Sequence, residues 1–349
     1  SGEHKVARAY VLYREERARE RQAAQKKQAP AAPRSTLRVT LADGSKVPLD
    51  ENRLKRVVEE ACQGVDGAVP ETIVEEALRS LFDGVSESDV SKAVTMAGRL
   101  FIEREPNYTF VAARLLLDTA RNEALTFLAG RRDEATQTEM TERYALYFEA
   151  YVKRAIDLEL MDPRLGNYDL KRLGAALKPE RDFNFTYLGL QTLYDRYFLQ
   201  SRGTRFELPQ AFFMRVAMGL AINEIEPEAW TIKFYDLLSS FDFMSSTPTL
   251  FNSGTLRPQL SSCYLTTVPD DLDGIFSAIR DDALLSKYAG GLGNDWTPVR
   301  GMGAHIKGTN GKSQGVVPFL KVANDTAVAV NQGGKRKGAM CAYLETWHM

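Results

Sequence analysis

The sequence predicts a mixed fold, α+β in its first part and α/β in its last. A strand-like alternation around a DG turn at residues 37–49 indicates a β-hairpin. Helical patterns, many with aromatic faces, follow from residue 51 to about 245. Beyond 245, short strand-like runs alternate with helical runs, which is typical of an α/β domain.

The bulk composition is that of an ordinary globular protein. The chain has 349 residues, enough for two or three domains, of which 44% are hydrophobic and 26% charged. Its net charge of −1 argues against a general nucleic-acid binder, which needs a strong positive field. Three cysteines and no apolar run of membrane-spanning length lead us to expect a cytoplasmic protein without direct nucleic-acid or membrane partners. The Ser-Gly start and the abrupt end lead us to expect a fragment.

The first part is expected to contain a helix, a linker and a small domain. Residues from Glu3 to about 28 have a short apolar stripe followed by mixed charges, typical of an exposed helix. Residues 29–35, APAAPRS, have the composition of a linker. After the hairpin, helices are expected at 51–63, 70–81, 86–104 and 108–128. The sequence SESD at 86–89 is a start signal for the third of these helices.

The second part, 129–245, is expected to be helical. Aromatic faces such as RYALYFEAYVKRAI are far more often packing surfaces than cofactor sites, so we assign them to the core. From 246 on, SSCYLTTV and AMCAYLE read as strands, and LDGIFSAIRDDALLSKYA and VPFLKVANDTAVAV as helices. Two glycine-rich loops are expected between them: GGLGNDWTPVRGMGAHIKGTNGKS and NQGGKRKGA.

Several common site motifs are absent from the sequence. Residues 311–313, GKS, end like a phosphate-binding P-loop, but Ile306 stands where that pattern needs glycine. No GxGxxG follows a strand and opens a helix, and no GxSxG supplies a nucleophilic serine. The three histidines do not cluster and no CxxC or HExxH occurs, so we expect no metal site in this chain.

One dense stretch nevertheless resembles a known family. TPTLFNSG, RPQLSSC, SKYAGGLGNDW, HIKGTNG and QGGKRKGA occur in this order, and together they resemble the large, catalytic subunit of class I ribonucleotide reductase. Residues 36–128, with VTLADGS and NYTFVAARLLL, are similar to the ATP-cone that precedes its catalytic part. The resemblance implies the last helix of a preceding, truncated cone (1–28), a linker (29–35), an ATP-cone of one β-hairpin and a four-helix bundle (36–128), a helical N-terminal domain (129–245) and the first part of a ten-stranded α/β barrel (246–349).

The resemblance implies reduction of ribonucleoside diphosphates to 2′-deoxyribonucleoside diphosphates by thiyl-radical chemistry. In that family the radical removes the 3′-hydrogen and a cysteine pair supplies the reducing equivalents; Cys263 matches one member of the pair. A cysteine after a strand-like start is more often buried and structural in general, but within this motif the redox role is favoured. The residues that match substrate contacts are Thr249, Ser262, Ala289, Gly290, Gln332 and Arg336.

A structural role stays open for Thr249 and is the expected one for Cys341. The hydroxyl of Thr249 could instead cap its own loop. Cys341 matches no motif, and we expect it in the core.

The family's allosteric specificity site is implied as well, at a homodimer interface. Asp270 matches the carboxylate that accepts a hydrogen bond from the 3′-hydroxyl of a deoxynucleoside triphosphate effector, and basic residues would attract the triphosphate with its Mg²⁺. Residues 332–338 match the loop that links the effector to substrate choice. The matched residues of the effector site are Asp270, Asp271, Leu272, Lys287, Arg300 and Lys307.

The cone departs from the family pattern at its nucleotide contacts. Four hydrogen-bond donors are replaced and one carboxylate is gained, and each lost charge-assisted bond is worth roughly 1.5–3 kcal/mol. We therefore expect a cone that folds but does not bind ATP or dATP. The positions concerned are Leu41, Ala42, Glu87, Ser91, Thr119 and Asn122.

The implied partners complete the expected enzyme. A small (beta) subunit containing a metal would generate the radical, and a thioredoxin- or glutaredoxin-type protein would restore the cysteine pair. The radical cysteine and the second redox cysteine would lie beyond Met349, so this chain alone should be inactive. Two alternatives stay open: an adenosylcobalamin-dependent reductase, which shares the SSC strand, and a non-catalytic regulatory module that binds nucleotides.

Overall fold

The computed structural model describes residues 37–41, 43–287, 290–330 and 338–348. The expected helix at 3–28 and the linker at 29–35 lie outside the described residues.

The predicted hairpin and four helices of the small domain are confirmed. Strand β1 pairs antiparallel with β2 and parallel with β3, a two-residue strand that the sequence analysis missed. The hydroxyl of Ser86 accepts a hydrogen bond from the backbone N–H of Asp89 at 3.1 Å, which fixes the start of the third helix. The elements are β1 (Arg38–Thr40), β2 (Lys46–Pro48), α2 (Glu51–Cys62), α3 (Pro70–Ser80), β3 (Val85–Ser86), α4 (Glu87–Leu100) and α5 (Tyr108–Ala129).

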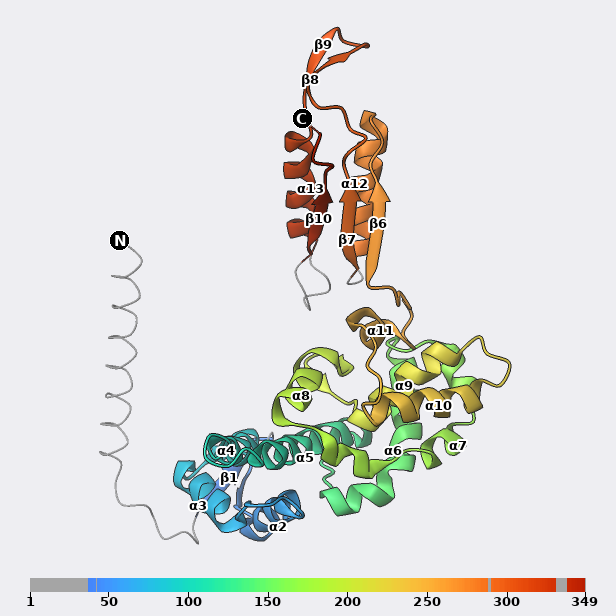
Figure 1. The fold of residues 1–349 in the computed structure, drawn as a ribbon. Helices are drawn as coiled ribbons and strands as arrows, with labels where there is room; N and C mark the ends of the chain where they lie inside the picture. Colours follow the sequence, from blue (N-terminus) through green and yellow to red (C-terminus); the bar gives the residue numbers. More distant parts are fainter. Residues whose placement is uncertain (1–36, 42, 288–289, 331–337, 349) are drawn as a thin grey trace, which may run out of the picture.

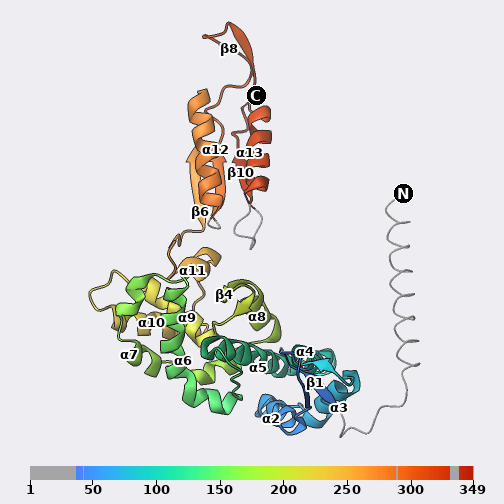
Figure 2. The same cartoon turned by 180° about the vertical axis from the view of Figure 1, so that it is seen from behind.

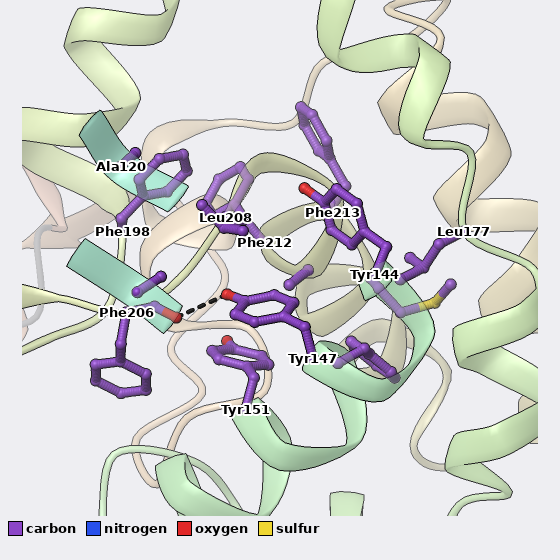
Figure 3. Close-up of a cluster of buried hydrophobic side chains, with 14 of the residues drawn as sticks. Ala120, Tyr144, Tyr147, Tyr151, Leu177, Phe198, Phe206, Leu208, Phe212 and Phe213 are labelled. Atoms are coloured by element: carbon purple, nitrogen blue, oxygen red, sulfur yellow. Dashed lines mark hydrogen bonds between the residues drawn. The ribbon is translucent and has the colours of Figure 1, made fainter. Parts of the chain in front are cut away.

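A larger helical domain follows, with one short hairpin that was not predicted. The predicted aromatic stripe is buried: Tyr151 packs against Phe206, Tyr144 meets Tyr147 edge-on, and the Tyr147 hydroxyl donates to the Phe206 carbonyl at 2.7 Å (Figure 3). The elements are α6 (Gln137–Asp157), η2 (Pro163–Asn167), α7 (Leu170–Ala175), η3 (Pro179–Asn184), α8 (Tyr187–Thr192), η4 (Leu193–Tyr197), β4 (Gln200–Ser201), β5 (Thr204–Arg205), α9 (Pro209–Ala221), α10 (Pro227–Ser239) and α11 (Thr247–Asn252).

Helix α5 belongs to both of these domains. Tyr108, Val111 and Leu115 pack in the core of the small domain, while Leu116 and Leu117 pack in the core of the helical domain. Gly130, in the left-handed conformation at φ 66°, ends the helix. The two domains are therefore joined through a shared helix.

The last part is a parallel sheet with helices on one face. Its strand order is β10–β7–β6, and both pairings are parallel. Figures 1 and 2 show this unit beyond the helical domain, with α11 at the junction. The elements are β6 (Cys263–Thr267), α12 (Leu272–Ser286), β7 (Gly291–Asp295), β8 (Met302–Ile306), β9 (Gly311–Gln314), α13 (Val317–Ala329) and β10 (Met340–Tyr343).

The first predicted glycine-rich loop is therefore wrong in part, because it contains the strands β7, β8 and β9. Strand β7, GLGND, is the central strand of the sheet. A Cβ on Gly293 would lie 2.7 Å from Leu265 Cδ2 and 3.0 Å from Tyr343 Cε2. Side chains from both neighbouring strands thus lean across β7, and glycine in a strand permits this close approach.

Candidate active site

Cys263 is the first residue of β6, and its thiol is exposed. The backbone N–H of Gly291 donates to the Ser262 carbonyl at 2.6 Å and fixes the start of β6 against β7. The Ser262 hydroxyl donates to the Cys263 sulfur at 3.5 Å. The structure thus presents a thiol and a hydroxyl together at one accessible strand end.

Cys263 lies on the face of the sheet that the helices leave open. Helices α12 and α13 pack on the other face around a core that includes Ile275, Ile279 and Trp296. Because side chains alternate along a strand, Cys263 and Leu265 share the open face, and Leu265 is 79% exposed. A substrate can therefore approach the sheet from this side.

The same face carries Cys341 and Tyr343, from β10. Cys341 is exposed, so the expectation that it belongs to the core is wrong. The reason is the alternation of β10: Met340 packs against the core beneath the helices, which turns Cys341 to the opposite side. A hydrogen bond with Cys341 and the charge of its thiolate raise the pKa of Tyr343. Sequence analysis assigned no role to Tyr343, although the alternation of MCAY carried the signal.

Thr249 ties the TPTLFNSG motif to the strand that carries Cys263. It lies on α11, and its hydroxyl donates to the Leu260 carbonyl at 2.9 Å. The side-chain amide of Asn252 donates to the Gln259 carbonyl at 2.8 Å. The Thr249 hydroxyl therefore bonds across to the segment before Cys263 rather than only capping its own loop.

Of the other matched substrate residues, Gly290 lies within the described part of the chain. Gly290 is buried, and a Cβ there would lie 3.0 Å from both the Leu285 carbonyl oxygen and Tyr264 Cε2. Packing within the chain is thus a sufficient reason for glycine at this position. Ala289, Gln332 and Arg336 lie outside the described residues.

Asp270 and Arg300, both matched to the effector site, meet at the start of α12. The Arg300 Nε lies 3.0 Å from both carboxylate oxygens of Asp270, and the Arg300 backbone N–H donates to Oδ1 at 2.9 Å. Burial alone would raise the pKa of Asp270, but the hydrogen bonds from Arg300 outweigh it and hold the pKa below its usual range. Arg300 Nη1 also donates to the His305 carbonyl at 3.2 Å, which brings the β8–β9 hairpin to this pair.

The remaining effector residues separate into two groups. Asp271 caps α12 by accepting from the backbone N–H of Gly274 at 2.8 Å, and Leu272 beside it is 64% exposed. Lys307 follows β8 and is exposed. Lys287 ends the 15-residue α12, about 22 Å from its start, so one chain does not bring it to Asp270. The place of Lys287 in the effector site and the homodimer both stay predictions.

Family models match three successive parts of the chain. They are the ATP cone domain over residues 37–123, the ribonucleotide reductase all-alpha domain over 183–258 and the ribonucleotide reductase barrel domain over 261–349. The chain belongs to the ribonucleotide reductase large-subunit family. The parallel strands β6, β7 and β10 accordingly form part of its barrel domain, which is not closed within the described residues.

Relatives from distant organisms agree with this assignment. The chain is 48% identical over 356 residues to the ribonucleoside-diphosphate reductase subunit alpha of Chlamydia muridarum, which covers 100% of the chain and 33% of that protein. It is 38% identical over 314 residues to the subunit alpha of Helicobacter pylori, and 34% identical over 319 residues to the large subunit of Danio rerio; each match covers 89% of the chain and 38% of the relative. The chain thus spans about a third of the length of these reductase subunits.

The described residues contain neither a membrane-spanning helix nor a cluster of metal ligands. None of their helices is both long and apolar enough to cross a bilayer. Within the same part of the chain, no three His, Cys, Asp or Glu side chains lie together as a metal site would need.

In the reductase cone, Glu87, one of the positions predicted to be lost, belongs to a network of ion pairs. Arg53 lies 3.3 Å from Asp118 and 2.7 Å from Glu134. Arg132 lies 2.6 Å from Glu87 and 2.7 Å from Glu134. Burial raises the pKa of Glu87 although Arg132 lies beside it. Sequence analysis missed Arg53 and Arg132; the partners of Arg53 and the Glu87 partner of Arg132 lie far along the chain.

Two of the other predicted cone positions, Asn122 and Ser91, contact members of this network. Asn122 donates to Asp118 at 3.2 Å, and the Ser91 hydroxyl lies 3.5 Å from the Glu87 carbonyl. Leu41 is in the hairpin turn, where its backbone N–H donates to the Ser45 carbonyl. Thr119 is half-buried on α5, and Ala42 lies outside the described residues.

Proposed function

We propose that the protein containing this chain reduces ribonucleoside diphosphates to 2′-deoxyribonucleoside diphosphates, with Cys263 as one of its two reducing thiols. The observation that carries the proposal is the exposed Cys263 thiol beside the Ser262 hydroxyl on the open face of the sheet. The membership of the chain in the ribonucleotide reductase family supports it.

The reaction needs two electrons, which a pair of thiols supplies. A thiyl radical elsewhere in the protein takes the 3′-hydrogen of the ribose and later returns it. The 2′-hydroxyl leaves as water, and the thiols of Cys263 and a second cysteine are oxidised to a disulfide. A thioredoxin- or glutaredoxin-type dithiol then reduces the disulfide, and a metal-containing small subunit supplies the radical. We place this enzyme in the cytoplasm as a homodimer or higher oligomer.

The test uses the full-length large subunit with its small subunit. Cys263→Ser should lower the turnover of ribonucleoside diphosphates by more than about 100-fold, because the serine can neither form the disulfide nor match the acidity of a thiol. Cys62→Ala is the matched control, since Cys62 is buried in the small domain away from the sheet. Full turnover by Cys263→Ser would exclude the redox role and favour a nucleotide-binding regulatory module.

The radical source distinguishes the second candidate enzyme. Turnover that requires the small subunit supports the class I reaction, whereas turnover by the large subunit with added adenosylcobalamin alone would indicate the cobalamin-dependent one. The ATP cone matched at residues 37–123 supports regulation of the enzyme by nucleotides. This particular cone, however, is proposed to have lost its own nucleotide site.

The cone's own nucleotide binding is proposed to be lost. Its guanidinium groups Arg53 and Arg132 are already paired with Asp118, Glu134 and Glu87, so their charge is neutralised within the chain before a triphosphate can bind. Calorimetric titration of dATP into the chain carrying Arg300→Ala, which weakens the effector site, should give no binding at micromolar concentration. Micromolar binding there would overturn the proposal.

A further inference from the structure

The helical domain contains an ion pair from which water is fully excluded. Arg215, on α9, and Glu207, just before it, both have fully buried side chains, with Arg215 Nε 2.7 Å from Glu207 Oε1. Glu207 also accepts from the hydroxyl of Tyr151 and from the backbone N–H of Leu199. A buried pair of this kind is stable only when its hydrogen bonds are complete, so the position of Arg215 is strongly determined.

Arg215 also bonds two backbone carbonyls at the end of α11. Its Nη1 donates to the Ser253 carbonyl at 2.6 Å, and its Nη2 to the Leu250 carbonyl at 3.4 Å. These carbonyls lie at the C-terminal end of α11, where a helix leaves acceptors without partners and favours positive charge. Arg215 therefore completes the end of this short helix.

Backbone packing holds the end of α11 against α9 as well. The Ser253 hydroxyl donates to the Val216 carbonyl at 2.7 Å. A Cβ on Gly254, which has φ +76°, would lie 2.8 Å from the Arg215 carbonyl oxygen, and a Cβ on Gly219 would collide with Gly254. No side chain separates the two segments, so a shift of Arg215 is passed directly to the end of α11.

Helix α11 in turn is tied to the segment that leads into Cys263. Thr249 and Asn252 bond the carbonyls of Leu260 and Gln259. Contacts thus run without interruption from Glu207 through Arg215 and α11 to the residues immediately before Ser262 and Cys263.

We propose that Arg215, held by Glu207, is a positioning residue for nucleotide reduction: it fixes the end of α11 and so places Thr249, Ser262 and Cys263 toward the substrate. This rests on the proposed function. Apolar side chains would stabilise the core of the helical domain as well as a buried ion pair or better, so stability alone does not explain Arg215. Two of its donors bond carbonyls at the end of α11, the helix that leads into the segment carrying Cys263.

The experiment compares two buried changes in the full-length large subunit assayed with its small subunit. Arg215→Lys keeps the charge but loses the fork that reaches both carbonyls. Tyr147→Phe is the matched control: it removes a buried 2.7 Å hydrogen bond to the Phe206 carbonyl in the same core and leaves α11 untouched (Figure 3). Each variant is measured for Tm, for kcat and KM with a ribonucleoside diphosphate, and for hydrogen exchange over residues 247–263.

Arg215→Lys should lower kcat/KM by about 10-fold or more and accelerate exchange over 247–263, with effector affinity unchanged. Tyr147→Phe should lower the Tm by an amount comparable to Arg215→Lys, while its kcat/KM stays within about twofold of wild type. Equal kinetic losses at equal Tm would mean that Arg215 is only structural and would overturn the proposal.

A second variant decides the question if Arg215→Lys does not fold. Ser253→Ala removes the hydroxyl bond to Val216 without disturbing the buried charges. It should accelerate exchange over 247–263 and lower kcat/KM severalfold, and normal values of both would overturn the proposal. A wild-type enzyme without nucleotide reduction would instead contradict the proposed function, and the exchange rates would still report whether Arg215 holds this segment.

Discussion

In the cone, Arg53 and Arg132 face the three carboxylates of Asp118, Glu134 and Glu87, whereas at the start of α12 the guanidinium of Arg300 faces the single carboxylate of Asp270. Both places correspond to nucleotide sites in the resemblance that the sequence carries. Within the cone network the Arg53–Asp118 pair is partly closed off, with 27% and 7% of its side chains exposed, whereas the Arg132–Glu87 pair is open, at 54% and 39%. The Arg300–Asp270 pair lies between them, at 35% and 37%.

Under the proposed function, pairing within the chain is what separates the effector site from the cone. Arg53 and Arg132 of the cone each bond two carboxylates of the chain, whereas Arg300 bonds one. The pair at α12 instead stands beside the N-terminus of a 15-residue helix, which favours anions, and near the exposed Lys307. The pKa of Glu87 is raised, chiefly by burial, whereas the hydrogen bonds from Arg300 lower the pKa of Asp270.

The largest expected effect comes from breaking the pair at α12. In the full-length protein, Arg300→Ala should weaken dTTP binding by about 10–100-fold, because a charge-assisted bond worth roughly 1.5–3 kcal/mol is lost and Asp270 is left unpaired. Calorimetric titration measures this. Arg280→Ala is the control, since Arg280 is exposed on the same helix and pairs with Asp281 at 3.0 Å. Unchanged dTTP affinity in Arg300→Ala would remove the reason to treat the two regions differently.

The second effect tests whether the cone network is structural. Arg53→Ala should lower the free energy of unfolding by about 1–3 kcal/mol, because Asp118 and Glu134 lose a partly buried partner. Arg56→Ala, on the same helix, should cost less than about 0.5 kcal/mol, since its pair with Glu139 is 3.8 Å long and exposed. Chemical denaturation of the chain measures both. Equal losses would mean that the network adds nothing beyond an ordinary surface pair.

Local patterns predicted most of the fold correctly. The hairpin at 37–49, the Ser86 cap and the helices α2–α5, α12 and α13 follow from turn chemistry and apolar periodicity within one segment. The two-residue strand β3 exists only through its pairing with β1, about 45 residues earlier. Strand β7 reads as a glycine loop because Leu265 and Tyr343, from other strands, provide the side chains that cover it.

The sequence names the candidate site residues but does not predict the contacts between them. Motifs located Cys263, Thr249 and Asp270, and the resemblance suggested their roles. They could not indicate that Arg300 pairs with Asp270 across 30 residues, nor that Arg53 and Arg132 share Glu134 in the cone. Such pairings depend on how distant segments pack, which a single sequence does not determine.

The smallest effect is a pair of opposite pH dependences. The raised pKa of Glu87 means that the native state binds its proton more tightly than the unfolded state does, so the stability from this group is present at low pH and is lost as the pH rises through the folded-state pKa. For Asp270 the lowered pKa means that its contribution is present above the ordinary aspartate pKa and is lost as the pH falls. Each difference should stay below about 1 kcal/mol, because both side chains are more than a third exposed.

Glu87→Gln and Asp270→Asn read out these two slopes. Relative to wild type, Glu87→Gln should become more favourable as the pH rises from 4 to 7, because the neutral amide avoids the cost of ionising a partly buried carboxyl among other carboxylates. Asp270→Asn should become less favourable over the same range, because wild type then gains the bond from Arg300. Denaturation midpoints of the three chains at about pH 4, 5.5 and 7 measure the slopes. Slopes of the same sign would contradict the view that burial governs the proton of Glu87 while the hydrogen bonds from Arg300 govern that of Asp270.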